Sequence, residues 1–453
     1  MSNQPSDKNV TLVLFHNDLR IADNATLLKA ANLSSNGRLL LVYVSSLTDT
    51  LNNKKDQHAY HYDTMGHARQ QFLHESLADL NVSLMQLGNR LLYLQKNPAV
   101  SDTFMQLNEL IEQQQVTDIC ISQTADYNQN QAYALLQNQH PQVHWHIQTT
   151  ATLFDELPLE DLPKSFTQFR KKIESDYDLL NAQTDIATCL TPKSLAQMPE
   201  SMLSKHEYFF ESQSSDERRL DKPSQQVSSF KGGESNGLKH VEAYFDSDAP
   251  RTYKTTRNAL DDWTHSTKFS AWLANGALSV NVILNRLRRY ERDVIANGST
   301  YWIWFELLWR EYFYWYAVTH QQTLFLFKGI GQHIRSTQWD QRRLEQWKNG
   351  QTPYPIINAC MNQLNATGYM SNRGRQLVAS CFIHELGLDW RYGATYFEQN
   401  LIDYDVASNW GNWQYLAGVG ADPRGCRQFN LAKQTQQYDP NGDFIRQWQG
   451  ETQ

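Results

Sequence analysis

The first 150 residues alternate short, continuously apolar runs with stretches of helical periodicity. Five such runs are strand candidates: 10–15, 39–44, 91–94, 118–121 and 143–147. Between the second and third runs, Leu73, Leu77 and Leu80 are spaced i, i+4 and i+7, as in a helix that packs on a sheet. Strands that are apolar on both faces and alternate with helices indicate a parallel, doubly wound sheet. The sequence therefore predicts an α/β domain over residues 1–150.

The usual nucleotide and zinc signatures are missing from the chain. No G-x-x-x-x-G-K-S/T loop is present, and the glycine pairs at 329/331 and 418/420 lack a third glycine. His384 and Glu385 resemble the opening of a zinc helix, but Leu388 stands where its second histidine is needed. These absences exclude the NAD-binding, phosphate-loop and zinc-protease classes, and we predict no metal site.

The second half of the chain differs from the first in amino-acid composition and charge. Residues 231–453 hold twelve of the 13 tryptophans and 23 Lys and Arg against 21 Asp and Glu, whereas residues 1–230 carry 18 against 27. Residues 151–240 are polar, with Gln and Ser clusters at 212–229, and read as an inter-domain linker. Helical periods dominate residues 241–453, so the predicted fold is an α/β domain followed by an all-α domain. Only the Arg-bearing second half could attract phosphate groups, and we expect such an attraction to be modest and salt-sensitive.

The cysteines and the termini favour a reducing compartment. The five cysteines (Cys120, Cys189, Cys360, Cys381 and Cys426) are odd in number and include no C-x-x-C pair. No secretory signal is visible at the N-terminus. The most membrane-like stretch, 301–318, contains Glu306, Arg310 and Glu311, so a buried helix explains it better than a membrane span. We expect a cytoplasmic monomer without a membrane partner.

Polar side chains interrupt three aromatic helical segments of the second half. These stripes are Glu306, Trp309 and Arg310; Asn372, Arg375 and Gln376; and Asp405, Asn409 and Trp413, preceded by Asp403. Spacings of three and four residues put each stripe on one helix face, which predicts a pocket for a heterocycle and an anion. A self-satisfied ion pair between Glu306 and Arg310 would explain the first stripe equally well. The string STKFS at 266–270 offers hydroxyls, backbone N–H groups and Lys268 to a diphosphate at a helix start.

Seven ordered motifs extend from the first strand to the last helices. They are NDLRIADN (17–24), FTQFRKKIE (166–174), YKTTRN (253–258), STKFSAWLANGALS (266–279), ELLWREYF (306–313), TGYMSNRGRQ (367–376) and LIDYDVASNWGNWQY (401–415). With these motifs the chain resembles the DNA photolyase/cryptochrome family over nearly its whole length, and most closely the DASH-type cryptochromes.

The resemblance implies FAD bound in the all-α domain. By motif matching, the diphosphate region would be held by Ser266, Thr267, Lys268, Phe269 and Ser270, with Tyr253 nearby. Further cofactor contacts would come from Arg310, Asn372, Arg375, Asp403 and Asp405. Asn409 would lie at the flavin N5 edge, where an uncharged amide can adapt to either redox state of the ring.

The resemblance also implies an activity, the blue-light-driven repair of cyclobutane pyrimidine dimers by an electron from excited reduced flavin. Glu306 and Asn372 would hydrogen-bond the dimer, and we expect burial to favour a protonated Glu306. Trp309 would stack on the dimer, Gln376 would contact it, and Arg373 and Arg427 would meet phosphates. Tyr415 stands where double-strand photolyases have Trp, so the second stacking wall is weaker and single-stranded or looped DNA is the expected substrate. Trp339, Trp390 and Trp413 match the electron relay that re-reduces the flavin.

Some features leave alternatives open. The family resemblance implies a 5,10-methenyltetrahydrofolate antenna in some members, but Asn128, Gln129 and Asn130 occupy the neighbourhood of the acidic residue that holds it. His16 stands where relatives commonly have Arg, and Ala271 replaces a usual Pro. A signalling cryptochrome, which acts as a blue-light photoreceptor, would use the same FAD and tryptophans. RNA stays an alternative to single-stranded DNA, and a non-photochemical flavin oxidoreductase would need a nicotinamide site that the sequence does not show.

Overall fold

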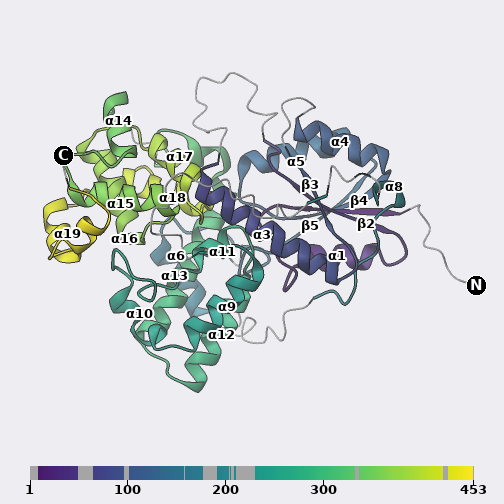
Figure 1. Cartoon of the computed structure of the whole chain (residues 1–453), viewed down its shortest axis with the longest axis horizontal. Coiled ribbons are helices and arrows are strands. Elements are labelled where there is room, and N and C mark those ends of the chain that lie inside the picture. Colours follow the sequence, from purple (N-terminus) through teal and green to yellow (C-terminus); the bar gives the residue numbers. More distant parts are fainter. Residues whose placement is uncertain are drawn as a thin grey trace, which may run out of the picture.

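In the computed structural model of the protein, two bodies lie side by side, with the sheet at one end and most helices at the other (Figure 1). The structure describes residues 9–48, 65–95, 102–157, 159–176, 191–203, 205, 209–210, 230–331, 336–421 and 427–451. Cys189, Cys426 and the Gln and Ser clusters at 212–229 lie outside these residues. Cys120, Cys360 and Cys381 are buried free thiols.

The N-terminal body is a five-stranded, fully parallel sheet, which confirms the predicted α/β domain. Its strands are β1 (Val10–Phe15), β2 (Arg38–Val44), β3 (Leu91–Leu94), β4 (Val116–Ser122) and β5 (His144–Gln148), in the order β3-β2-β1-β4-β5. Helices α1 (Ala25–Leu33), α3 (His67–Gln86), α4 (Thr103–Gln113) and α5 (Tyr127–Gln139) connect and cover the strands. Alternate residues of β1 enter two separate apolar clusters, Leu12 and Leu14 on one face, Val13 and Phe15 on the other. Burial of both faces explains why the strands read as continuous apolar runs.

The C-terminal body is helical, as the periodicity predicts. Its helices after the sheet are α6 (Phe166–Ser175), α8 (Glu200–Leu203), α9 (Glu234–Phe245), α10 (Ala249–Thr256), α11 (Ser270–Ala274), α12 (Val280–Asp293), α13 (Gly298–His320), α14 (Gln341–Lys348), α15 (Pro355–Thr367), α16 (Asn372–Ser380), α17 (Trp390–Asn400), α18 (Val406–Ala417), α19 (Leu431–Tyr438) and α20 (Asp443–Gln447). A 3-10 turn, η2 (Gln321–Phe325), follows α13, and a π-helical turn, η3 (Cys381–Glu385), follows α16. Helix α8 is an exception among these helices. It packs on the sheet of the N-terminal body, where Met202 is part of the apolar cluster on one face of the sheet.

Helix α13 contains the stretch that resembled a membrane span. Its start is fixed by a capping box, in which the Asn297 side chain accepts from Thr300 N and the Thr300 hydroxyl accepts from Asn297 N. Trp304, Leu308 and Tyr312 are buried in the helical core. Within the described part of the chain, we find no helix whose length and hydropathy would let it cross a bilayer.

The two bodies are joined through the turn that follows β1. The guanidinium of Arg20 is 2% exposed and donates to the carbonyls of Thr150 at 2.8 Å and Gly276 at 2.9 Å. Glu234 at the start of α9 accepts from the backbone N–H groups of Ile21 and Ala22 at 2.8 and 2.9 Å. The NDLRIADN motif therefore positions the helical body on the carboxyl edge of the sheet.

A second buried carboxylate anchors the segment that leaves the sheet. Glu311 on α13 is 1% exposed, and it accepts from Leu153 N at 2.9 Å and Trp315 Nε1 at 2.7 Å. Burial raises the pKa of Glu311 from its ordinary value of 4.5 to about 7, although these two hydrogen bonds oppose the shift. The folded protein therefore retains this proton between pH 4.5 and 7, where the unfolded chain has released it.

We expect Glu311→Gln to remove one pH-dependent contribution to folding. Because the folded-state pKa is raised, this contribution is fully present below pH 4.5 and is lost as the pH rises through 7. Between pH 5 and 8, the free energy of unfolding of the wild type should therefore fall by about 3 kcal/mol relative to that of the variant. Urea denaturation across this pH range measures the difference, with the exposed Glu109→Gln on α4 as control. A difference that stays constant with pH would contradict the prediction.

Candidate functional site

Two adjoining cavities in the helical body bring the predicted site residues together. The larger has a volume of about 520 Å³ and the smaller about 110 Å³. Asn372, Arg375, Gln376 and Asp403 line both. The larger cavity also contains most of the other predicted residues: Tyr253, Ser266, Thr267, Lys268, Ser270, Glu306, Trp309, Arg310, Arg373, Tyr415 and Arg427. The smaller one adds Asp405, Asn409 and Trp413.

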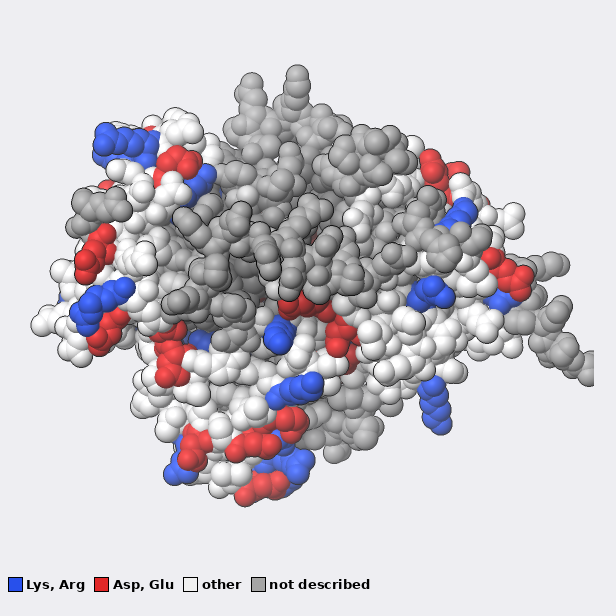
Figure 2. All heavy atoms as spheres, viewed as in Figure 1, with Lys and Arg blue, Asp and Glu red and all other residues white. Residues whose placement is uncertain are grey.

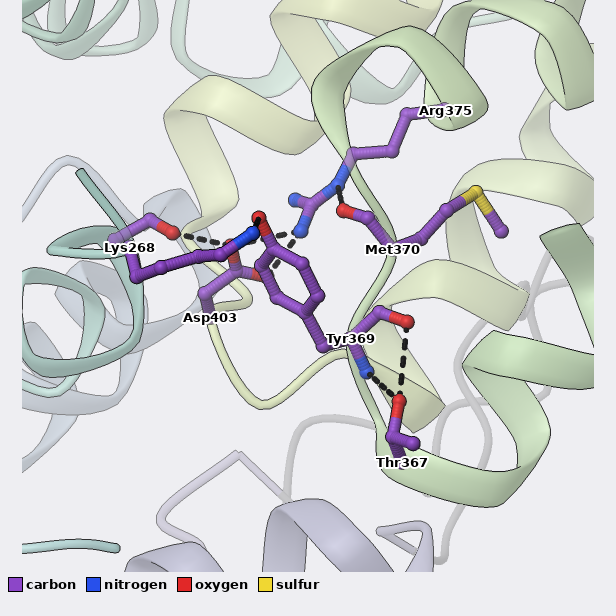
Figure 3. A network of polar contacts seen from close by, with 7 residues as sticks. Lys268, Thr367, Tyr369, Met370, Arg375 and Asp403 are labelled. Carbon is purple, nitrogen blue, oxygen red and sulfur yellow. Dashed lines mark hydrogen bonds and ion pairs between the residues drawn. The ribbon is translucent and has the colours of Figure 1, made fainter. Parts of the chain in front are cut away.

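A buried ion pair stands where the two cavities meet. Arg375 Nη2 lies 2.9 and 2.8 Å from the two carboxylate oxygens of Asp403, which is 7% exposed (Figure 3). Ser270 donates to the same carboxylate at 2.7 Å, and Arg375 Nε donates to Met370 O at 2.9 Å. These bonds fix the start of α11 against the loop before α18 and hold the Arg375 guanidinium at the cavity wall.

The STKFS segment forms the opposite wall. Lys268 has a φ of 56°, in the left-handed region, and its ammonium donates to Tyr369 OH at 3.2 Å (Figure 3). The carbonyl of Thr267 is 2.8 Å from His240 Nε2. Phe269, the next residue, is right-handed, with φ −64° and ψ −21°. A left-handed residue followed by a right-handed one turns successive backbone N–H groups to one side, which is the form of an anion-binding nest. Phe269 differs from its neighbours, because its ring is 2% exposed and packs against Tyr244.

The residue that caps α18 and a residue one turn later line the smaller cavity. Asp405 is the N-cap of the helix and accepts from Ser408 N at 2.7 Å. Asn409 is 8% exposed, and its Nδ2 donates to Ala394 O at 3.0 Å. This bond fixes the Asn409 amide against α17 at the wall of the smaller cavity.

The Glu306 carboxylate has a different partner from the one considered in the sequence. It pairs with Arg257 at 2.6 Å, whereas Arg310 donates to the carbonyls of Ala151 and Leu273, so the alternative of a Glu306–Arg310 pair is wrong. The reason is geometric, since α10 packs directly on α13 and Arg257, the residue that ends α10, lies beside Glu306. Burial raises the pKa of Glu306 and the positive charge of Arg257 opposes this shift.

Aromatic rings form two walls of the larger cavity. Trp309 stacks on Phe166 with ring centroids 3.8 Å apart and planes inclined by 14°. Tyr415 meets Trp309 edge-on at 6.2 Å, and the Arg427 guanidinium lies over the Tyr415 ring at 4.6 Å. The FTQFRKKIE motif therefore supports Trp309 from behind.

The second arginine predicted to meet phosphate lies among other rings. Arg373 donates to Asn258 Oδ1 at 3.1 Å, and its guanidinium lies 4.8 Å from the centre of the Tyr438 ring and 5.8 Å from that of Phe429. Burial lowers the pKa of Arg373 from its ordinary value. Its guanidinium is therefore held in place by α19 and the segment before it.

The three predicted relay tryptophans contact different aromatic partners. Trp413 is buried, with Phe397 at 5.3 Å, and a Cβ at Gly393 would come within 2.2 Å of its ring. Trp390 is buried against Trp410 at 5.7 Å. Trp339 is 59% exposed and packs on Tyr392 at 4.7 Å. The three positions thus include one at the cavity, one in the core and one at the surface.

Sequence reasoning assigned no role to Arg257, Phe166 or Tyr369. Arg257 and Phe166 belong to motifs quoted above, and Arg257 follows Tyr253 by four residues, so helical spacing could have placed it on the cavity face. Tyr369 precedes the Asn372 stripe by three residues but lies before the helix, which hid its contact with Lys268.

A helical body with a deep, donor-lined cavity, seated on the carboxyl edge of a parallel sheet, is the architecture of a two-domain nucleotide-cofactor protein. Residues 302–453 match the FAD binding domain of DNA photolyase, and residues 11–190 match the DNA photolyase family. The chain therefore belongs to the DNA photolyase/cryptochrome family and carries its FAD-binding domain.

Within this family, the chain is similar to cryptochrome DASH proteins. It is 48% identical over 451 residues to cryptochrome DASH of Idiomarina loihiensis, with 98% of this chain and 94% of the relative covered. The same identity and coverage relate it to cryptochrome DASH of Vibrio parahaemolyticus. A crystal structure of a cryptochrome from Synechocystis sp. superposes with a TM-score of 0.82 at 36% identity, covering 97% of this chain and 88% of that one.

The side chains that line the two cavities fit FAD. The hydroxyls of Ser266 and Thr267 and the Lys268 ammonium offer donors to a diphosphate, while the Ser270 hydroxyl, which donates to Asp403, holds the segment in place. The Asn409 oxygen offers an acceptor to a flavin edge, and its amide is already fixed by Ala394.

A further cavity of about 330 Å³ lies between α5 and the end of α13, in the neighbourhood predicted for a folate antenna. Its described lining residues include Gln123, Asn130 and Gln131 but no acidic side chain. The cavity thus lacks the carboxylate that the family resemblance implies for the antenna, which leaves the antenna unsupported.

We expect Asp403→Asn to weaken FAD binding, because the change leaves the partly buried Arg375 guanidinium at the cavity wall without its counter-charge. Loss of one partner of a buried pair costs about 3 kcal/mol, so the purified variant should retain much less flavin by the ratio of flavin to protein absorbance. Asp340→Asn removes a surface pair with Arg343 and serves as the control. Equal flavin content in Asp403→Asn and wild type would contradict this role.

Proposed function

We propose that the protein repairs cyclobutane pyrimidine dimers under blue light, with single-stranded or looped DNA as its preferred substrate. The observation that carries the proposal is the composition of the 520 Å³ cavity, where Glu306, Asn372 and Trp309 converge beside the residues that fit FAD. When bound, FAD supplies the photochemistry, the donation of one electron from its light-excited reduced form. The protein's own residues have to bind, orient and shield the dimer.

Hydrogen bonds would orient the dimer inside the cavity. The carboxyl group of Glu306 lies between a wall that holds Arg257 and the open cavity, so it can face a pyrimidine imide or carbonyl group while its ion pair fixes its position. Asn372 begins α16 and can both donate and accept. A dimer held by these two groups would have one orientation relative to the cofactor.

The aromatic walls would exclude water and stack on the dimer. Trp309 is held rigidly by Phe166, whereas Tyr415 is a smaller ring backed by Arg427. Base stacking on an aromatic side chain contributes about 1–3 kcal/mol, so a weaker second wall offsets less of the cost of extracting a dimer from a duplex. A single strand requires no unpairing, and Arg373 and Arg427 would meet its phosphates.

We expect efficient repair of a dimer in single-stranded oligothymidylate and much slower repair of the same dimer in a duplex. Because extraction from the duplex costs a few kcal/mol, the difference should be at least tenfold at subsaturating substrate. Recovery of thymine absorbance under blue light measures both rates, and a dark sample is the control. Absence of repair by the FAD-loaded protein would refute the proposal and favour a photoreceptor, while equal rates would refute the substrate preference.

We expect Glu306→Ala to lower the repair yield while FAD stays bound. The substitution removes the hydrogen-bonding group on the dimer side of the cavity and leaves Arg257 unpaired. The yield of repaired dimers per absorbed photon should fall by about tenfold or more, the typical effect of losing a positioned electrostatic contact. Glu291→Gln, which changes a carboxylate paired with Arg288 on α12, is the matched control. An unchanged yield in Glu306→Ala would exclude this role.

A further inference from the structure

A second large cavity adjoins the proposed substrate cavity and has no part in the function described so far. It has a volume of about 610 Å³ and lies between the start of α15, the π-helical turn η3 and the start of α19. Phe429 lines both this cavity and the substrate cavity. A volume of this size is within the range of small-ligand sites and can take a nucleobase.

The polar groups of this cavity centre on one carboxylate. Glu385 is exposed on η3, and its Oε1 accepts from Gln428 Nε2 at 2.9 Å and its Oε2 from Tyr354 OH at 3.4 Å. Both donors are neutral. A carboxylate has about four acceptor positions, so Glu385 retains capacity for further donors. Asn430 and Thr435 complete the polar lining.

The charges on the two sides of Phe429 are opposite. On the side of the substrate cavity, Arg373 lies 5.8 Å from the centre of the Phe429 ring. On the other side Glu385 would repel a phosphate. A strand that passes Phe429 would therefore keep its phosphates on the arginine side and turn a base toward Glu385.

The separation of charges around Phe429 contrasts with the surface over α9 and α12, where the two signs are mixed. Acidic and basic side chains interleave over α9 and α12 on the face seen in Figure 2. Arg286 of α12 pairs with Glu242 of α9 at 2.7 Å. Such a surface offers a nucleic acid no continuous attraction. Arg373 and Glu385, on opposite sides of Phe429, thus place a positive and a negative charge where they can orient a strand near the substrate cavity.

We propose that this second cavity receives the base next to the dimer and that Glu385 selects a base with an exocyclic amino group. The proposal rests on the dimer-repair function proposed above. A carboxylate only accepts hydrogen bonds, so it favours the amino groups of cytosine, adenine and guanine. Guanine fits best, because its ring N–H and its amino group are adjacent donors. Thymine presents two carbonyl oxygens and a single N–H, and would be disfavoured.

The test compares flanking bases that stack alike but differ in one amino group. Fluorescence anisotropy in the dark would measure the Kd of the FAD-loaded full chain for dimer-containing oligothymidylates whose flanking nucleotides are deoxyguanosine, deoxyinosine or thymidine. Inosine lacks only the 2-amino group of guanosine. A specific base contact contributes about 1–3 kcal/mol, so we expect guanosine flanks to bind roughly tenfold more tightly than inosine flanks.

Glu385→Gln and Glu109→Gln give the matched comparison, because each removes one negative charge from an exposed side chain. The preference for guanosine should fall below about twofold in Glu385→Gln, whose amide donates as well as accepts, and stay near tenfold in Glu109→Gln. Equal Kd values for guanosine and inosine flanks in wild type would overturn the proposal, as would an unchanged preference in Glu385→Gln. A failure of this kind with light-driven repair intact would leave the repair function standing, whereas loss of both dimer binding and repair would refute the function itself.

Discussion

The burial of one guanidinium between the two bodies is the interaction on which the rest of the structure depends. Arg20 cannot be solvated at 2% exposure, so its N–H groups need partners inside the protein, and they donate to the backbone carbonyls of Ala22, Asp23, Thr150 and Gly276. The single guanidinium group thereby connects three separate parts of the chain. The position of the sheet relative to the cofactor cavity follows from this arrangement.

Close packing makes the same junction specific. Gly276 has a φ of 68°, and a Cβ there would come within 1.9 Å of Asn17 O. A side chain at this position would therefore meet backbone that cannot move without displacing the turn after β1. The glycine in STKFSAWLANGALS is thus explained by contact with the NDLRIADN turn, two motifs that are more than 200 residues apart in the sequence.

The periodicity of the sequence predicted the fold well, and the site less completely. Strand β1 and the stripe of Leu77 and Leu80 on α3 could be recognised because burial repeats at a fixed interval. The partner of Glu306 could not, because Arg257 stands at the end of another helix and no local pattern records which cation that helix brings to Glu306. Phe166 behind Trp309 was hidden for the same reason. Local spacing shows which side chains share a face, while contacts between distant elements need the packed structure.

The carboxylates of Glu234 and Glu311 have a consequence for the way this chain could evolve. Both belong to helices of the second body, yet their donors include backbone N–H groups of Ile21, Ala22 and Leu153, which precede those helices in the sequence. A gene fragment encoding the helices alone would leave these acids without those donors. Recombination that exchanged one half for that of an unrelated protein would thus be penalised, and the two halves are expected to be inherited as a unit.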